Sequence, residues 1–523
     1  MLGMALLIAL PYFLYTFRPE YRGLVPFRTN DDGFYMGRLD AAAQGHFREF
    51  QNGITGPPAQ GVAPALLELL GGTLFSWTGL HGPQISVILT VLIAPLMIPL
   101  IAGTLRASGV GKGLSLASGL TYTITFLSPL QRPIYMSLAL PLALGTIFSL
   151  LRTWQHPRSS RILLTVLLTG SLPAVYFWDF SYVWAVGGWF LLLHLLLLRT
   201  STWKRERTHV LLLVGVLTFL FSMPFLLKLV LASRAYPFSA EVSLRNQVVP
   251  THMIESPMRS ILLSLLVLLT MFLLRSVRRK EDVLKTAIFP SALVFAAWTV
   301  MHQNLLHGIL LTFSSHYYPF VCLAAVSVAA WALAHARGTW PSRGIVAIAA
   351  IFLLAGFWDY RGAWALPFAP REHLDLQHLA PALKILSDGK RQTILTDYRS
   401  AQMVTNWTDD DTVFTPYVRH LLVSNREFAE RYCLTEVFNS AGPDIFWIAR
   451  EATHTRAQSF LPEREREFGE VCAALLANPV AALREYGVDF LLWNERERPT
   501  WKVDEDLFTQ IANGEDWRLY RIR

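Results

Sequence analysis

The sequence has little charge and few cysteines. Asp, Glu, Lys and Arg make up 16% of its 523 residues, whereas soluble domains usually carry about a quarter. Three cysteines, Cys322, Cys433 and Cys472, are too few for a disulfide-rich scaffold. What the chain has instead is 53% hydrophobic residues and a mean hydropathy of +0.36. The composition therefore excludes a small disulfide-stapled protein and indicates a membrane protein.

Motifs for several kinds of chemistry are also missing. The sequence contains no CxxC or HExxH metal-ligand spacing and no Gly-rich phosphate-binding fingerprint. It therefore assigns no cofactor, and a divalent metal is left open with little support. Residues 1–17 lack a basic stretch and a small-residue cleavage site, so we expect an uncleaved first span rather than a signal peptide. Cys433 and Cys472 could pair outside the cytoplasm or remain free thiols.

Long apolar runs dominate the first two thirds of the chain. A membrane span needs about 20 mostly apolar residues. We expect eleven spans, near 1–17, 84–105, 113–130, 133–151, 162–178, 181–199, 209–231, 259–275, 284–303, 316–335 and 344–358. A further run at 62–80 contains Glu68 and follows several prolines, so we predict that it lies along the membrane interface without crossing.

Basic residues predict the orientation of these spans. The connections 106–112, 152–161, 199–207, 275–285 and 335–343 hold two, three, four, five and two Lys or Arg, whereas the turns 179–181 and 304–315 hold none. Cytoplasmic loops are enriched in Lys and Arg, so the five clusters are expected inside. The segments 18–83 and 359–523 are then outside. If 62–80 crossed, the segment before it would be cytoplasmic.

The net charge of +8 follows from these clusters, which excludes a nucleic-acid partner as its explanation. The pattern suits a bacterial inner membrane.

Composition changes after residue 358, where polar and charged residues become frequent. We expect strands at 391–398, 412–417, 486–494 and 517–523, alternating with helices at 374–387, 424–433 and 464–486. The predicted fold is a polytopic α-helical membrane domain of about eleven spans plus interfacial helices (1–358), followed by an extracytoplasmic α/β domain (359–523). Residues 406–408, Asn-Trp-Thr, match an N-glycosylation sequon by pattern.

An acidic pair, Asp31 and Asp32, opens the polar part of the first external segment, "RTNDDGFYMGRLDAAAQGHF" (28–47). Asn30 to Gly33 precede a stripe of apolar residues at helical spacing, so the pair could simply cap a helix. The alternative is a catalytic base at the membrane surface, because two neighbouring carboxylates disfavour each other's charge and one becomes the stronger base. One of the two could also bind a metal or orient the acceptor.

The layout resembles the type C membrane glycosyltransferases, the GT-C superfamily. The shared features are the first span, the external acidic pair, the interfacial helix, the long bundle and the external domain with a late strand, "YGVDFLLWN" (486–494). The family includes protein mannosyltransferases, aminoarabinose transferases and oligosaccharyltransferases, which take a sugar from a polyprenyl-phosphate or polyprenyl-diphosphate carrier. The resemblance implies that Asp31 and Asp32 are the catalytic acids.

Two departures separate this sequence from the oligosaccharyltransferases. Their WWDYG motif is absent, and the second external turn (128–137) has no acidic residue where those enzymes carry metal-binding carboxylates. Both departures argue against en bloc oligosaccharide transfer and against metal dependence.

Transfer from a lipid-phosphate sugar also needs groups that bind the phosphate and the sugar. Arginine suits phosphate because its planar fork matches two oxygens, although each arginine could instead reach lipid headgroups. Asp179 lies where two spans meet, as a functional residue or a turn residue. The predicted substrate-binding residues are Arg38, Arg132, Asp179, Arg234, Arg245, His316 and Tyr317.

We therefore predict a membrane glycosyltransferase that moves a sugar from a polyprenyl-phosphate-linked donor to an extracytoplasmic acceptor, such as envelope glycan, lipid or protein. Its partners are that donor and membrane lipid, and its oligomeric state is left open. The alternative is a transporter or flippase of lipid-linked glycan, which would place more charges within the spans than Lys228 alone. A wall-binding module on a membrane anchor would need fewer spans.

Overall fold

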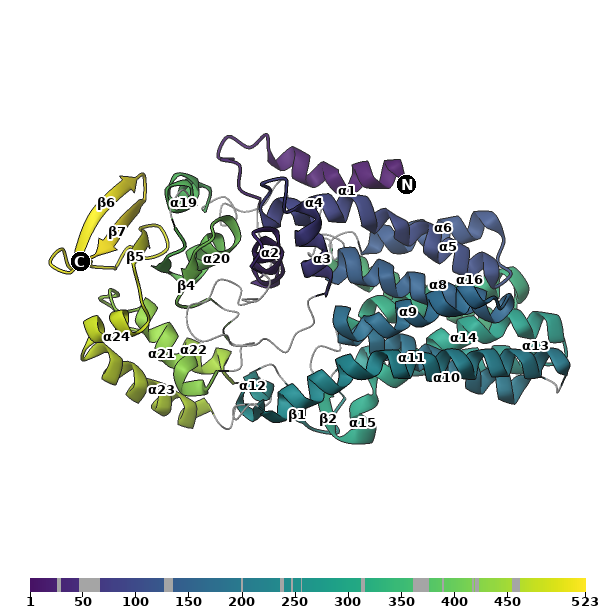
Figure 1. The fold of residues 1–523 in the computed structure, drawn as a ribbon. Helices are drawn as coiled ribbons and strands as arrows, with labels where there is room; N and C mark the ends of the chain where they lie inside the picture. The colour runs from purple at the N-terminus through teal and green to yellow at the C-terminus, as the bar shows by residue number, and fades with distance from the viewer. Residues whose placement is uncertain are drawn as a thin grey trace. The chain divides into compact units, whose positions relative to one another are not determined.

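The structure is a computed structural model that describes residues 1–25, 30–46, 66–126, 135–198, 201–235, 239–245, 248–254, 256–311, 316–360, 376–387, 390–415, 418, 423–453 and 461–523. It is a polytopic α-helical integral membrane protein with a small C-terminal α/β domain, as predicted (Figure 1). Two compact units divide the chain. The first comprises residues 1–9, 89–229 and 250–364, and the second comprises residues 10–88, 230–249 and 365–523.

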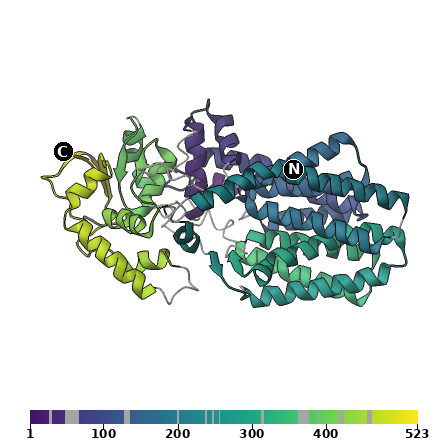
Figure 2. The same ribbon diagram turned by 60° about the horizontal axis from the view of Figure 1, so that its bottom comes forward.

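The first unit is a helical bundle, whose helices run side by side in both views (Figure 1, Figure 2). Its helices are α5 (Met97–Ala107), α6 (Lys112–Thr125), α8 (Leu140–Gln155), α9 (Ser159–Val175), α10 (Phe177–Leu197), α13 (Pro257–Val277), α14 (Glu281–Met301), α15 (Gln303–His307), α16 (Tyr318–His335) and α17 (Trp340–Tyr360); it also holds β2 (Ile309–Leu311). Four elements have an end in each unit: α1 (Leu2–Tyr15), α4 (Gly82–Ile93), α11 (Thr202–Ala235) and β1 (Val248–Pro250).

Every predicted span coincides with a helix. Within the described ranges, eight helical stretches are long and apolar enough to cross a membrane, beginning with the nearly continuous stretch Gly82–Ala107. The remaining three predicted spans fall on α1, α6 and α9, which have 14, 14 and 17 residues. At 1.5 Å per residue these three are about 21 to 26 Å long, somewhat less than a hydrocarbon core of about 30 Å.

The apolar run that we predicted to lie at the interface forms a short helix, α3 (Leu66–Phe75). Its ten described residues extend about 15 Å, half of what a bilayer crossing needs. Residues 62–65 of the predicted run lie outside the described residues, so its lying along the interface stays a prediction.

The second unit contains the C-terminal domain together with the first external segment. Its elements are α2 (Asn30–Ala43), α3, α12 (Ser239–Arg245), α19 (Ala380–Ser387), α20 (Tyr398–Trp407), α21 (Asn425–Thr435), α22 (Ile445–Glu451), α23 (Leu461–Leu476), α24 (Pro479–Glu485), β3 (Thr393–Leu395), β4 (Asp411–Thr412), β5 (Phe490–Asn494), β6 (Phe508–Gly514) and β7 (Trp517–Ile522).

A five-stranded mixed sheet organises this domain, with the strand order β4-β3-β5-β7-β6. Strand β3 pairs in parallel with β4 and β5, and β7 pairs antiparallel with β5 and β6. The parallel pairs require crossover connections, which helix α20 provides between β3 and β4. Three of the predicted strands are present in shorter form, and the predicted strand 412–417 shares only Thr412 with β4. Strand β6 and helices α20 and α22 were not predicted, and the predicted helix 464–486 is two helices, α23 and α24.

The structure of the C-terminal domain answers two questions that the sequence left open, namely whether the cysteines pair and whether the sequon is accessible. Cys433 on α21 and Cys472 on α23 form a disulfide, while Cys322 is buried in α16. Asn406 of the apparent sequon is fully buried in α20, and its amide donates to the Gln402 carbonyl at 2.6 Å. The folded domain therefore offers no access to a glycan at this position.

Candidate functional site

The acidic pair lies in the first turn of α2, since this helix begins at Asn30. The side chains of Asn30, Asp31 and Asp32 lie outside what the structure describes. The middle turns of the helix are buried from Met36 to Asp40. What can be established is how firmly the helix that carries the pair is held.

A buried ion pair joins α2 to α3. The Arg38 guanidinium lies 3.2 Å from the Glu68 carboxylate, and the two side chains are 5% and 1% exposed. Burial raises the pKa of Glu68, and the neighbouring Arg38 charge lowers it. We predicted Arg38 as a substrate-binding residue; the structure places it against a buried carboxylate.

A second polar anchor connects α2 to the start of α4. The Asp40 carboxylate accepts a hydrogen bond from the Gly82 amide at 2.7 Å and lies 3.1 Å from His81 Nδ1. Burial raises the pKa of Asp40, while the bonds to His81 and Gly82 lower it. For His81, burial lowers the pKa, but the Asp40 carboxylate outweighs it and the net direction is upward. The pair thus fixes the last half of α2.

Two glycines let neighbouring backbones approach α2 closely. A Cβ atom at Gly72 of α3 would overlap Ala42 and the Leu39 carbonyl, and one at Gly82 would overlap the Met36 carbonyl. Only residues without a side chain fit at these two positions. Helix α2 is therefore wedged between α3 and the start of α4.

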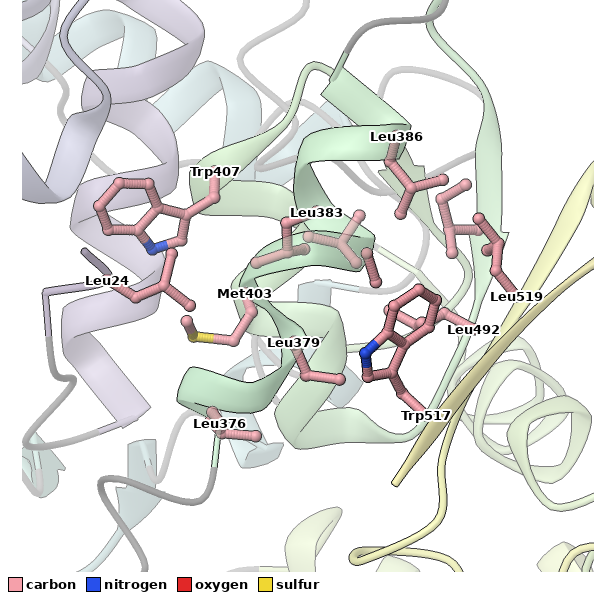
Figure 3. Close-up of a cluster of buried hydrophobic side chains, with 13 residues drawn as sticks. Leu24, Leu376, Leu379, Leu383, Leu386, Met403, Trp407, Leu492, Trp517 and Leu519 are labelled. Atoms are coloured by element: carbon pink, nitrogen blue, oxygen red, sulfur yellow. The ribbon is translucent and has the colours of Figure 1, made fainter. Parts of the chain in front are cut away.

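The segment that leads into α2 is clamped to the C-terminal domain. The Gln377 side chain accepts hydrogen bonds from the backbone amides of Arg22 at 2.9 Å and Leu24 at 3.3 Å, and donates to the Leu24 carbonyl at 2.8 Å. Leu24 is buried in the same hydrophobic cluster as Met403 and Trp407 (Figure 3). Burying one leucine stabilises by about 2 kcal/mol. The chain on both sides of the acidic pair is thus anchored within the second unit.

The first unit holds a separate group of the predicted residues, at the end of the bundle where α10 and α16 begin. Asp179, in the first turn of α10, is fully buried, and neither carboxylate oxygen has a hydrogen-bond partner among the described residues. An unpaired carboxylate inside a bundle is costly, and the helix N-terminus offsets only part of this cost. Asp179 therefore remains a candidate functional residue.

Aromatic side chains surround this end of α10. The Tyr317 hydroxyl lies 2.7 Å from Ser181 Oγ, and His316 Nδ1 lies 2.7 Å from the Tyr176 hydroxyl. The His316 ring also stacks on Trp178, with centroids 6.0 Å apart. Stacked rings and hydroxyl groups of this kind suit the faces and hydroxyls of a sugar.

The three other predicted arginines differ in their surroundings. Arg132 lies outside the described residues. Arg234 is exposed in the last turn of α11. Arg245 is buried on α12, where its guanidinium donates to Asn425 Oδ1 and to the Val423 carbonyl, both at 2.6 Å. Arg245, predicted as a substrate-binding residue, thus fastens α12 to the C-terminal domain.

No group of three or more His, Cys, Asp or Glu side chains that could hold a metal ion occurs among the residues that the structure describes. The segment 302–320 contains three histidines, His302, His307 and His316, and among the described residues they do not form such a group. His302 Nδ1, for example, contacts the Trp298 carbonyl at 2.8 Å.

Sequence reasoning missed the partners that hold α2. Asp40, His81 and Gln377 were not singled out, and Glu68 was noted only as an obstacle to crossing. One signal was available, because a glutamate in an apolar run is almost never buried without a paired charge. The identity of that partner, thirty residues earlier, could not be found from spacing.

No protein-family model and no curated protein matches the chain. Among solved structures it is similar to the Archaeoglobus fulgidus oligosaccharyltransferase in complex with Zn and sulfate, with 12% identity and a TM-score of 0.47, over 100% of this chain and 73% of that one. It is also similar to another structure of that enzyme, tethered with an acceptor peptide containing an NVT sequon. That match has 13% identity and a TM-score of 0.47, and it covers 95% of this chain and 69% of that one.

The chain is also similar to ArnT from Cupriavidus metallidurans bound to undecaprenyl phosphate, with 12% identity and a TM-score of 0.43, over 99% of this chain and 98% of that one. Both proteins are GT-C glycosyltransferases, the superfamily whose layout this sequence resembles. At these identities and TM-scores the activity has to be argued from the chain's own residues.

Proposed function

We propose that this integral membrane protein is a glycosyltransferase that moves a sugar from a polyprenyl-phosphate-linked donor to an acceptor hydroxyl or amine outside the cytoplasm. The observation that carries the proposal is an acidic pair opening a helix that is anchored on three sides, by Glu68, by His81 with Gly82, and through Gln377 by the segment that precedes it. Anchoring of this kind is what a catalytic group needs, because misplacement by about 1 Å can cost a hundredfold in rate.

Asp31 or Asp32 is the proposed base. It takes the proton from the acceptor, the acceptor atom forms a bond to the anomeric carbon, and the bond from that carbon to the phosphate oxygen breaks with its electron pair leaving on the polyprenyl phosphate. The proton remains on the carboxylate until solvent removes it. Arg38 and Asp40 act as positioning residues, since both are buried against partners on neighbouring elements.

The other proposed contacts are to the donor. Asp179, His316 and Tyr317 are proposed to contact the sugar, and Arg234, which is exposed, is proposed to contact its phosphate. Arg132 stays a prediction of the same kind. The carrier class comes from the sequence resemblance, and the C-terminal domain is proposed to face outward, where its disulfide would persist.

The test is transfer by the purified chain from a radiolabelled sugar on undecaprenyl phosphate to an envelope extract. Asp31→Asn/Asp32→Asn should lower the rate by about a hundredfold or more, the usual contribution of a general base. The matched control is Glu505→Gln/Asp506→Asn, which neutralises a neighbouring, exposed acidic pair of the C-terminal domain. Equal rates for both double variants, with unchanged melting temperatures, would contradict the proposal. Donor movement across vesicles without any transfer would favour the flippase alternative.

A further inference from the structure

One end of the helical bundle carries a basic cavity that the proposed reaction does not use. It has a volume of about 580 Å³ and lies where α8 ends, α9 begins and α11 begins. We call it the basic pocket; its lining residues are Arg152, His156, Pro157, Arg158, Arg161 and Arg207. Helix α10, about 30 Å long, runs from Asp179 toward this end of the same unit, so the pocket and Asp179 lie at opposite ends of the bundle.

The charged residues that line the basic pocket are all of one sign. Four arginines line it and no acidic residue does. Over the ranges that the structure describes, none of the four arginines forms an ion pair with a carboxylate. Their hydrogen bonds go to neutral groups: Arg161 donates to the His156 carbonyl at 2.9 Å, and Arg207 donates to the Gln155 carbonyl at 3.2 Å.

Some hydrogen-bond donors of the residues at the basic pocket have no partner among the described residues. Arg207 Nε is buried and has no hydrogen-bond partner among the described residues. A buried donor without a partner is rare and costs about 1–3 kcal/mol. The first turn of α9 also opens at this pocket, and its N-cap residue, Arg158, makes no capping bond with its side chain. The amides at a helix N-terminus attract anions.

A second basic loop of the same bundle, residues 275–285, allows a comparison with the basic pocket. In the 275–285 segment, Lys285 lies 3.2 Å from Glu281 and 3.5 Å from Asp282. Cytoplasmic enrichment in Lys and Arg explains a positive loop, but it does not require a concave pocket of arginines without a carboxylate. The other basic residues of that segment, Arg275, Arg278, Arg279 and Lys280, form no ion pair among the described residues either. The first loop is therefore distinguished by the convergence of four arginines on one cavity, not by the lack of ion pairs.

We propose that the basic pocket binds a phosphate group, supplied either by an anionic lipid headgroup or by a soluble phosphate compound. Several guanidinium groups and the amides of a helix N-terminus are together the donors that phosphate oxygens accept best. The volume exceeds that of one phosphate and admits the glycerol of a phosphodiester headgroup. The proposal does not depend on the proposed glycosyl transfer.

The test measures lipid and phosphate binding by the full chain. The protein is reconstituted in phosphatidylcholine nanodiscs, titrated with phosphatidylglycerol, and followed by native mass spectrometry of retained lipid. Arg158→Gln/Arg161→Gln should weaken phosphatidylglycerol binding about tenfold or more, because each lost bond to a charged group is worth about one factor of ten. The matched control, Arg278→Gln/Arg279→Gln, removes two exposed charges from the other loop and should change binding less than twofold.

Two further arms identify the source of the phosphate. If millimolar inorganic phosphate displaces the lipid from the wild-type chain, the pocket takes soluble phosphate compounds; if it does not, the pocket takes a lipid headgroup. Equal weakening in both double variants would overturn the proposal, since it would show a diffuse surface attraction. Absence of binding by both phosphatidylglycerol and inorganic phosphate would overturn it too. Melting temperatures of the variants, measured alongside, confirm that the fold is retained.

Discussion

Removal of Arg38 should be among the most damaging single changes in the second unit. Arg38→Met keeps most of the side-chain volume but leaves Glu68, which is 1% exposed, without its partner charge. Breaking a buried pair by deleting one member costs about 3–5 kcal/mol. Arg38→Met/Glu68→Leu removes both charges and should fall within about 1 kcal/mol of the wild type, because a well-packed apolar pair replaces a buried ionic one at little cost.

The matched control is the same substitution in an exposed pair of the same unit. Arg496 Nε lies 2.6 Å from Asp516, with side chains 39% and 38% exposed. This pair is shorter than the 3.2 Å Arg38–Glu68 pair, so distance alone would rank Arg496→Met as the more harmful change. Solvent screening ranks it lower, at about 0–1 kcal/mol.

Lower pH should relieve the Arg38→Met variant. Burial raises the pKa of Glu68, and loss of Arg38 removes the charge that opposed this shift. A carboxyl group whose pKa is raised on folding binds its proton more tightly in the native state, so its stabilising effect is complete at low pH and disappears as the pH rises through the folded pKa. The difference in the free energy of unfolding between Arg38→Met and the wild type should therefore become smaller as the pH falls below neutral.

Equilibrium unfolding in mixed detergent micelles, followed by tryptophan fluorescence at several pH values, measures these free energies. The reasoning fails if Arg38→Met costs no more than Arg496→Met. It also fails if the losses of Arg38→Met and Glu68→Leu simply add in the double variant, because groups in contact should couple.

Two other changes test the packing of the second unit. Gly82→Ala should cost about 1–3 kcal/mol and lower transfer activity, because its Cβ would meet the Met36 carbonyl and displace α2, whereas Gly113→Ala, with open space around its Cβ, should cost nothing in a thermal melt. Reduction of the Cys433–Cys472 disulfide, which spans 39 residues, should destabilise the chain by about 4 kcal/mol from loop entropy; a melting temperature that dithiothreitol leaves unchanged would refute this estimate.

The elements that were predicted well from the sequence are those that a pattern along the chain is enough to specify. A run of about 20 apolar residues has few options besides a membrane helix, so every predicted span coincides with a helix. Prediction was weaker where burial does not follow residue type. In α20, which was not predicted, all eight residues from Ser400 to Trp407 are buried although four of them are polar.

The same distinction between local pattern and tertiary packing applies to the candidate site. The sequence by itself determined that an acidic pair follows the first apolar run and begins a helix, because residue type and spacing are local properties. Only the tertiary structure decided what holds that helix, since Arg38 meets Glu68, Asp40 meets His81 and Gln377 meets Leu24 across 30 to more than 350 residues of chain. A buried polar group takes whichever partner packing brings within about 3 Å, and no pattern along the chain encodes that distance.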